Sequence, residues 1–304
     1  LRNYRLEGIR PVSHGTIHRI LVEAGLNNPI SKPRRVWGKR RFERPHSNSL
    51  WQADFKLTEQ DEWMISFLDD QVGIIMEKIK KLGLDQNTII MFSSDNGPED
   101  YRIGNAANAG VGSPGPLRAR KRSMHEGGIR TFGLVRWPGK VEAGSRCDQL
   151  ITLVDFFATA SEITGEKAPE AAEDSVSFLP ALSGKPIVST RKGVIHHSVS
   201  GHFAYRQGKW KLCLAKASGG WTAPKENQAE ADAPKAQLYD MEKDPSEQNN
   251  LYLTQPKIAE RLLADLTADV GNGRSTEGPE AKNDVEDIIL WKSGRGTLRK
   301  RSKQ

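Results

Sequence analysis

Cysteine is scarce in this sequence, which contains two cysteines in 304 residues. Cys147 and Cys213 lie far apart, do not form a C-x-x-C pair and have no histidine beside them. Disulfide frameworks and zinc sites need several cysteines or histidines at close spacing, so neither is expected here. We expect both thiols to be buried, because unpaired cysteine behaves as a small apolar side chain.

Long apolar runs are also lacking. The longest, such as ITLVDFFATA at residues 151–160, are far shorter than the roughly 18 residues that a membrane span needs. The N-terminus has no charged segment followed by an apolar one, so we expect no signal peptide and no membrane partner. The 37% hydrophobic content over 304 residues is still enough for two ordinary domains or one large α/β domain.

Positive charge is concentrated at the N-terminus. Residues 1–50 contain eleven Lys or Arg and three acidic residues, whereas the formal net charge of the whole chain is +7, so residues 51–304 are close to neutral. A basic head on a near-neutral body indicates a segment that faces nucleic acid. The alternative is a basic linker that is only solvated.

Residues 10–26, within this head, have the pattern of a helix. Ser13 can cap its N-terminus, apolar residues recur at helical spacing, and Gly25 ends it. It could be the second helix of a helix-turn-helix unit, which lays polar and basic side chains in a DNA groove. After a basic connector, residues 51–70 are predicted to form two strand-like runs around a polar turn.

This order of features, with RFERPHSNSLWQADF followed by WMISFLDD, resembles the front of a transposase or retroviral-type integrase with the ribonuclease-H-like fold. The resemblance implies that Asp54 is the first of three acidic residues that bind two metal ions, and that DNA is a partner of the head. It divides this part into a helix-turn-helix-like head with its connector at residues 1–44 and the start of an integrase-like core at residues 45–69.

A helix followed by a strand is predicted next. DDQVGIIMEKIKKLGLDQ places its apolar residues on one helical stripe, with Gly83 near its end. NTIIMF has the pattern of a short buried strand, and Asp95 and Asn96 follow its carboxyl end. Ligands of α/β sheets bind beyond such ends, and Asp and Asn supply oxygen ligands for Ca²⁺ or Mg²⁺. The alternative is that Asp-Asn-Gly, a common turn sequence, only forms a turn.

The remaining motifs follow in a recognisable order. After SSDNGP come LRARKRSMHEGGIRTFGLVRWPGKV, ITLVDFFATASEITG, HHSVSGHFAYRQGKWKLCL, QLYDMEKDPSEQNNL and GRSTEGPEAKNDV. Together they resemble the C-terminal portion of a formylglycine-dependent arylsulfatase over about residues 69–290. The resemblance implies an alkaline-phosphatase-like α/β fold, hydrolysis of a sulfate ester substrate and a Ca²⁺ cofactor. The family is usually exported, but the sequence itself leaves the localisation open.

The resemblance divides this body into three parts. It implies a sulfatase-like α/β portion at residues 70–190, a C-terminal subdomain with a small antiparallel sheet at residues 191–290, and a basic tail at residues 291–304. In the subdomain, HFAYRQGKWKLCL is predicted to form two strands that turn at Gln207-Gly208, and KIAERLLADLTADV to form an amphipathic helix. The adjacent histidines of HHSVSG point to opposite faces of a strand and are not expected to share a metal ion.

The resemblance also assigns site residues. Asp95 and Asn96 occupy positions that complete the calcium shell, and Lys121 matches the lysine that contacts the sulfate. Sulfuryl transfer develops negative charge on oxygen, so the site needs fixed positive charge. The alternative for Lys121 is a surface lysine in a basic loop. Glu126, Gly127 and Gly128 are expected to form a tight turn that reverses the direction of this loop. Arg130 is expected to form a structural ion pair and to have no catalytic role.

One part of the family pattern is not found. The nucleophile is a formylglycine made from the cysteine or serine of a C/S-x-P/A-x-R motif, but Cys147 is followed by DQLI and Cys213 by LAKA. SKPRR at residues 31–35 fits the bare pattern, and we interpret it as a coincidence because no strand or acidic pair precedes it. The nucleophile and the first half of the sheet are therefore expected to be missing, which leaves the chain inactive alone.

The shared Leu-Asp-Asp string at residues 68–70 leads to the hypothesis of a chimera joined there. Missing strands would expose sheet edges and apolar surface, so poor solubility is expected. The integrase resemblance offers a different assignment, in which Asp54, Asp95 and Glu126 form a three-carboxylate metal site for DNA strand transfer. An inert remnant is a third possibility, and it predicts neither activity.

Overall fold

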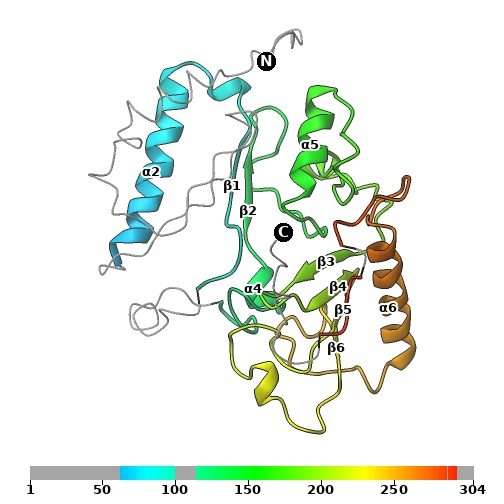
Figure 1. The fold of residues 1–304 in the computed structure, drawn as a ribbon. Helices are drawn as coiled ribbons and strands as arrows, with labels where there is room; N and C mark the ends of the chain where they lie inside the picture. The colour runs from blue at the N-terminus through cyan, green and yellow to red at the C-terminus, as the bar shows by residue number, and fades with distance from the viewer. Residues whose placement is uncertain (1–61, 100–113, 286, 293–304) are drawn as a thin grey trace, which may run out of the picture. The chain divides into compact units, whose positions relative to one another are not determined.

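The computed structural model describes residues 62–99, 114–285 and 287–292, with the side chains of residues 62–67 left out. The predicted basic head at residues 1–44 therefore lies outside the described residues, as does Asp54. The chain divides into two compact units, Leu1–Ile90 with Trp137–Gly139 and Met91–Arg136 with Lys140–Gln304 (Figure 1). No helix in the described ranges is both long enough and apolar enough to span a bilayer.

The described part of the first unit is built around helix α2 (Glu62–Lys81), which is followed by the short 3-10 helix η1 (Asp85–Asn87). Gly83, at φ 67°, ends the helix, and its N–H donates to the carbonyl oxygen of Lys80 at 2.9 Å. A glycine in the left-handed region is a common C-terminal signal of helices, as predicted here.

Helix α2 begins before the point at which the sequence analysis placed it. The second of the two strand-like runs predicted within residues 51–70 is helical from Glu62 onward, so that prediction was wrong. Met64, Leu68, Val72 and Ile75 are spaced three or four residues apart, and no glycine or proline interrupts the chain between residues 62 and 72. The helical period therefore outweighs the strand propensity of the apolar and aromatic residues. The predicted join at residues 68–70 lies inside one continuous helix.

The N-terminal part of the second unit contains a two-stranded sheet and short helices. The sheet is made of β1 (Ile90–Ser93) and β2 (Gly133–Arg136). The chain between and after these strands forms α4 (Glu126–Ile129), α5 (Asp155–Thr164) and the 3-10 helix η2 (Leu179–Ser183). The strand predicted in NTIIMF and the helix predicted in ITLVDFFATASEITG are both present. The strand was predicted to be buried, and that part was wrong, because Met91 is 38% exposed and no residue of β1 is fully buried.

A four-stranded antiparallel sheet forms the C-terminal part of this unit, in the order β3-β4-β5-β6. Its strands are β3 (Val194–His197), β4 (Phe203–Gln207), β5 (Trp210–Cys213) and β6 (Gln237–Asp240), with the 3-10 helix η3 (Glu226–Gln228) before β6. Strands β4 and β5 form a hairpin in which Gln207 pairs with Trp210. The small antiparallel sheet and its turn at Gln207-Gly208 are therefore confirmed.

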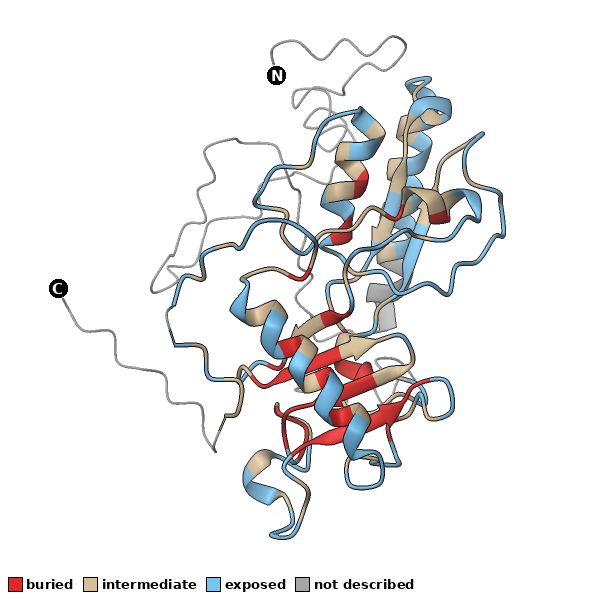
Figure 2. Cartoon of the chain, turned by 90° about the vertical axis from the view of Figure 1, so that its right-hand side faces the viewer, coloured by how far each residue is buried: buried red, intermediate tan, exposed pale blue. Residues whose placement is uncertain are grey.

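Helix α6 (Pro256–Gly271) packs against this sheet (Figure 1). Leu262 and Leu266, four residues apart, lie on its buried face and contact a core that includes Leu212 and Leu238 from the sheet. All four side chains are fully buried. Each contributes about 1.5–3 kcal/mol through the hydrophobic effect. Figure 2 shows that the buried residues are concentrated in this sheet.

The surface near β2 and α5 is different, because it leaves large apolar side chains exposed. Phe132 is 48% exposed, Leu134 in β2 is 61% exposed and Phe157 in α5 is 52% exposed. Exposed apolar surface of this kind agrees with the expectation from the sequence. Poor solubility remains a prediction.

Candidate functional site

The predicted Asp95-Asn96 pair lies directly after β1, in a turn that begins at Ser94. The Ser94 hydroxyl donates to the carbonyl oxygen of Asn96 at 3.0 Å, and Asn96 Nδ2 donates to the carbonyl oxygen of Gly97 at 3.1 Å. This bond uses the amide nitrogen of Asn96 and leaves its Oδ1 as an acceptor. Asp95 is exposed. The turn therefore presents one carboxylate and one amide oxygen, both of which suit a calcium ion.

Gly97 fixes this turn against a second segment. Its N–H donates to the carbonyl oxygen of Gly128 at 3.0 Å. A Cβ atom at position 97 would lie 1.9 Å from the carbonyl oxygen of Gly127, a distance that no real Cβ contact has. Only glycine fits this position, so the close approach between the turn and the Gly127-Gly128 segment depends on it.

Lys121 lies on the loop that leads into α4, beside the same turn. Its backbone N–H donates to the carbonyl oxygen of Pro98 at 2.9 Å, and its side chain is 32% exposed. Lys121 Nζ lies 4.0 Å from Glu99 Oε2, while Arg122 makes the closer ion pair with the same carboxylate. The structure therefore brings the segments of the two predicted groups, Asp95-Asn96 and Lys121, next to each other.

A buried charge network underlies this loop. Lys211 of β5 is fully buried, and its Nζ lies 2.9 Å from Glu126 Oε1 and 2.8 Å from Glu247 Oε1. The backbone N–H of Glu126 donates to Glu247 Oε2 at 2.7 Å. Arg130 Nε donates to Glu126 Oε2 at 2.6 Å, so the structural pairing predicted for Arg130 is confirmed.

The network keeps Lys211 and Glu126 charged. Burial alone raises the pKa of Glu126, but the Lys211 ammonium and the Arg130 guanidinium together lower it to about 2. Burial acts to lower the pKa of Lys211, but Glu247 and Glu126 outweigh it and the pKa is raised. The pKa of Glu247 is raised, mainly because this carboxyl is buried. Sequence reasoning missed Lys211 and Glu247; the one local signal was a lysine between apolar residues in the strand WKLC.

Two models of known protein families match this chain. The model described as Sulfatase matches residues 43–166, and the model described as N-sulphoglucosamine sulphohydrolase, C-terminal, matches residues 119–273, about half of the chain. The chain belongs to the sulfatase family. Its sulfatase match begins at residue 43, earlier than the resemblance noted from about residue 69, and so it includes the predicted join at residues 68–70.

Similar sulfatases of known name include the N-acetylgalactosamine-6-O-sulfatase of Bacteroides thetaiotaomicron, which is 34% identical over 203 residues, 64% of this chain and 39% of that protein. Arylsulfatase A of Homo sapiens is 32% identical over 195 residues, 60% of this chain and 37% of that protein. This chain therefore spans about two fifths of the length of these relatives.

Solved structures with a similar fold include the following two. One, from work on glycosaminoglycan metabolism by Bacteroides thetaiotaomicron, gives a TM-score of 0.57 at 31% identity and covers 66% of this chain and 42% of that one. Another, in complex with D-glucosamine-2-N,6-O-disulfate, gives a TM-score of 0.51 at 24% identity over 69% of this chain and 40% of that one. The α/β fold of the sulfatases is thus shown, with its small antiparallel C-terminal sheet.

The sulfatase nucleophile finds no candidate among the described cysteines. Cys213 is fully buried, as predicted, and burial raises its pKa to about 12, so it stays a protonated thiol. Cys147 is exposed, so the prediction that it is buried was wrong. Neither cysteine follows the sulfatase motif, and residues 31–35 lie outside the described residues. The formylglycine nucleophile therefore does not fit the described part of the chain.

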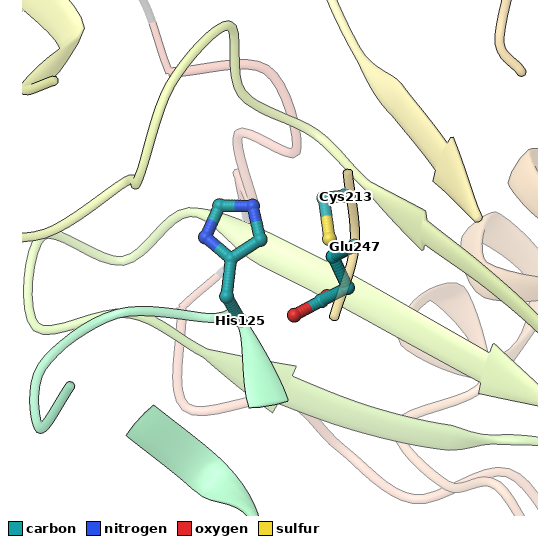
Figure 3. Close-up of side chains that lie close together, drawn as sticks. All are labelled: His125, Cys213 and Glu247. Atoms are coloured by element: carbon teal, nitrogen blue, oxygen red, sulfur yellow. The ribbon is translucent and has the colours of Figure 1, made fainter. Parts of the chain in front are cut away.

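Three other potential metal ligands, His125, Cys213 and Glu247, lie close together in the interior (Figure 3). The two ring nitrogens of His125 already make hydrogen bonds to Ser123 and Gln237. The Lys211 ammonium next to Glu247 would repel a cation. This cluster is therefore part of the core, and the oxygen donors of exposed Asp95 and half-buried Asn96 suit a calcium ion better by their chemistry.

Proposed function

We propose that this chain binds and positions sulfate esters for hydrolysis, with Asp95 and Asn96 as calcium ligands and Lys121 as the contact to the sulfate. The observation that carries the proposal is the pair of backbone hydrogen bonds from Gly97 to Gly128 and from Lys121 to Pro98, at 3.0 and 2.9 Å. These bonds join the two segments that hold the three residues. Membership of the sulfatase family supports the same assignment.

The chemistry of these side chains suits a sulfate ester. A bound calcium ion supplies positive charge that polarises the sulfate oxygens. Asp95 would hold that ion with its carboxylate and Asn96 with its amide oxygen. The Lys121 ammonium donates charge-assisted hydrogen bonds to an anionic oxygen. At 4.0 Å, Glu99 holds Lys121 loosely, which allows the ammonium to turn toward a bound anion.

We also propose that the chain alone does not release sulfate. Neither cysteine lies in the sequence motif whose cysteine or serine is converted to formylglycine, and the thiol of Cys213 is buried in the core. The described residues therefore supply binding and orientation of the substrate and leave out the group that attacks sulfur.

A binding titration tests this function. Wild type, Lys121→Ala and the exposed control Lys140→Ala are titrated with p-nitrophenyl sulfate and with N-acetylgalactosamine 6-sulfate in the presence of Ca²⁺. Loss of one charge-assisted contact is expected to weaken binding about tenfold in Lys121→Ala. Lys140→Ala is expected to bind as wild type does. Equal affinity in all three proteins would contradict the role of Lys121.

The integrase alternative requires Glu126 to join Asp95 as a metal ligand. Glu126 is buried and paired with Lys211 and Arg130, whereas Asp95 is exposed, so the two carboxylates have different surroundings. Asp54 and the basic head lie outside the described residues. The DNA-binding role of the head is tested by measuring the affinity for DNA at several salt concentrations. A working DNA-binding head gives an affinity that falls steeply as the salt concentration rises.

A further inference from the structure

Glu126 is one of the residues through which the C-terminal sheet contacts the loop of the candidate site. This residue begins α4 and is 4% exposed. Its carboxylate accepts a hydrogen bond from the Lys211 ammonium of β5, and its backbone N–H donates to the carboxylate of Glu247, which follows β6. Both parts of Glu126 are therefore held by residues of the sheet region, far away in the sequence.

Arg118 makes a second connection at the start of the same loop. Its Nη1 donates to Tyr239 OH at 2.7 Å and to the carbonyl oxygen of Glu247 at 2.9 Å. The carbonyl oxygen of Arg118 accepts a hydrogen bond from the N–H of Gly127 at 2.8 Å. The loop that carries Lys121 is thus held by the sheet at both ends, at Arg118 and at Glu126.

The backbone between this network and the calcium ligands is packed without free space. A Cβ atom at Gly127 would lie 2.2 Å from the carbonyl oxygen of Ala119, and one at Gly128 would lie 2.5 Å from that of Arg120. Gly128 in turn accepts the hydrogen bond from Gly97. A displacement of Glu126 is therefore transmitted to Gly97 and the Asp95-Asn96 turn, because no flexible side chain lies between them to absorb it.

We propose that Lys211 and Glu247 are positioning residues for the candidate site. Their contacts to Glu126 fix the Gly127-Gly128 segment, which sets the Asp95-Asn96 turn and the Lys121 loop in register for ion and sulfate binding. This inference rests on the proposed function. Buried ion pairs add little net stability compared with apolar packing of the same volume, so a role in fixing geometry explains the network better than stability does.

The test compares Lys211→Met with a matched control in the same unit, Arg191→Met. Arg191 makes a buried ion pair with Asp155 at 2.7 Å, and both side chains are as well covered as those of Lys211 and Glu126. The control pair joins α5 to the chain before β3. Among the described residues, the side-chain hydrogen bonds of Arg191 go to Asp155 and Asp174, which are not part of the candidate site. Both variants lose one partner of a buried pair, so both are expected to melt at lower temperature.

Calcium affinity of the full chain is measured by calorimetry at a temperature where circular dichroism shows all proteins folded. Lys211→Met is expected to bind Ca²⁺ about tenfold to 100-fold more weakly than wild type, as is typical when a residue that supports metal ligands is removed. Arg191→Met is expected to keep the wild-type affinity. Hydrogen exchange is expected to accelerate in peptides covering residues 93–99 and 117–130 of Lys211→Met, and to be unchanged there in Arg191→Met.

The outcomes separate the inference from the function beneath it. If wild type does not bind Ca²⁺, the proposed function is wrong. If wild type binds Ca²⁺ and Lys211→Met binds it equally well with unchanged exchange at residues 93–99, the function stands and the positioning role is wrong. If Lys211→Met does not fold, Glu247→Gln, which keeps an oxygen acceptor for the Glu126 N–H, is measured in the same way and is expected to bind more weakly than Arg191→Met.

Discussion

The backbone N–H of Gly97 donates a 3.0 Å hydrogen bond to the carbonyl oxygen of Gly128. These two residues lie in segments that the sequence separates by about thirty positions, and each segment carries part of the candidate site. The bond is possible because position 97 has no side chain and Gly127 stands opposite. The geometry of the site therefore depends on a contact between two stretches of backbone.

Gly97→Ala is expected to disrupt this contact. Its Cβ would lie 1.9 Å from the Gly127 carbonyl oxygen, so the turn must move. We expect a loss of about 1–3 kcal/mol in unfolding free energy, typical of overpacking, together with weaker calcium binding. Denaturant unfolding and a calcium titration measure both. Gly133→Ala is the control, because its Cβ would meet nothing within 4 Å, and equal behaviour of the two variants would contradict the account.

The buried ion pair between Asp155 and Arg191 is expected to be far more important for stability than an exposed one. Asp155 also accepts hydrogen bonds from the N–H groups of Thr152 and Val176 at 2.8 and 3.0 Å. Removal of one partner leaves a buried charge, so Arg191→Met is expected to cost about 3–5 kcal/mol. Lys81→Met, which breaks an exposed pair with Glu77, is expected to cost below about 0.5 kcal/mol. Chemical denaturation measures the unfolding free energy of both variants. Similar losses in Arg191→Met and Lys81→Met would show that burial does not strengthen the Asp155–Arg191 pair.

The stability of the fold is expected to depend on pH through His196. Burial, with the Lys211 charge as the next contribution, lowers the pKa of His196 to about 3, and its Nε2 is buried without a hydrogen-bond partner among the described residues. The imidazole of His196 therefore takes up a proton near pH 6.5 in the unfolded chain, but only near pH 3 in the folded chain. The contribution of His196 is therefore constant above pH 6.5 and falls as the pH drops below it.

His196→Gln removes this titration. Between pH 6.5 and pH 3, the unfolding free energy of wild type is expected to fall relative to that of His196→Gln by up to about 1.4 kcal/mol per pH unit. Denaturant unfolding at a series of pH values measures this difference. A constant difference across this range would contradict burial of an uncharged imidazole at position 196.

The exposed apolar side chains around β2 are expected to make the isolated chain associate. Leu134 and Phe132, two residues apart, are 61% and 48% exposed, and a two-stranded sheet leaves open edges. Replacement of both by Thr is expected to raise the soluble, monomeric fraction seen by sedimentation. Val188→Thr, at an exposed position elsewhere, is expected to have no effect. A wild-type chain that stays monomeric and melts cooperatively would contradict this prediction.

Much of the fold could be predicted from local patterns. Alternation along HFAYRQGKWKLCL and the Gln207-Gly208 turn predicted the β4-β5 hairpin, because both signals lie within a few residues. The Asp-Asn pair after an apolar strand was located correctly for the same reason. The second strand-like run predicted within residues 51–70 was wrong because a short apolar run fits both periods, and the longer helical pattern decides between them.

The network beneath the site could not be predicted in this way. Lys211 meets Glu126 across 85 residues of sequence, and Glu126 meets Glu247 across 121. A lysine side chain is buried only when groups of opposite charge lie beside it, and these groups come together only when the chain folds. Residues 120 to 122 illustrate the same limit, since a run of three basic residues does not reveal which one lies beside the Asp95-Asn96 turn.

The proposed function depends on calcium binding at the Asp95-Asn96 turn, which a titration with the ion measures directly. Wild type, Asp95→Ala and the exposed control Asp232→Ala are titrated with Ca²⁺ by calorimetry in metal-free buffer. We expect one calcium site in wild type and in Asp232→Ala, and an affinity about 100-fold weaker or more in Asp95→Ala, since a carboxylate ligand is removed. Equal binding in Asp95→Ala and wild type, or no binding in wild type, would contradict the proposed function.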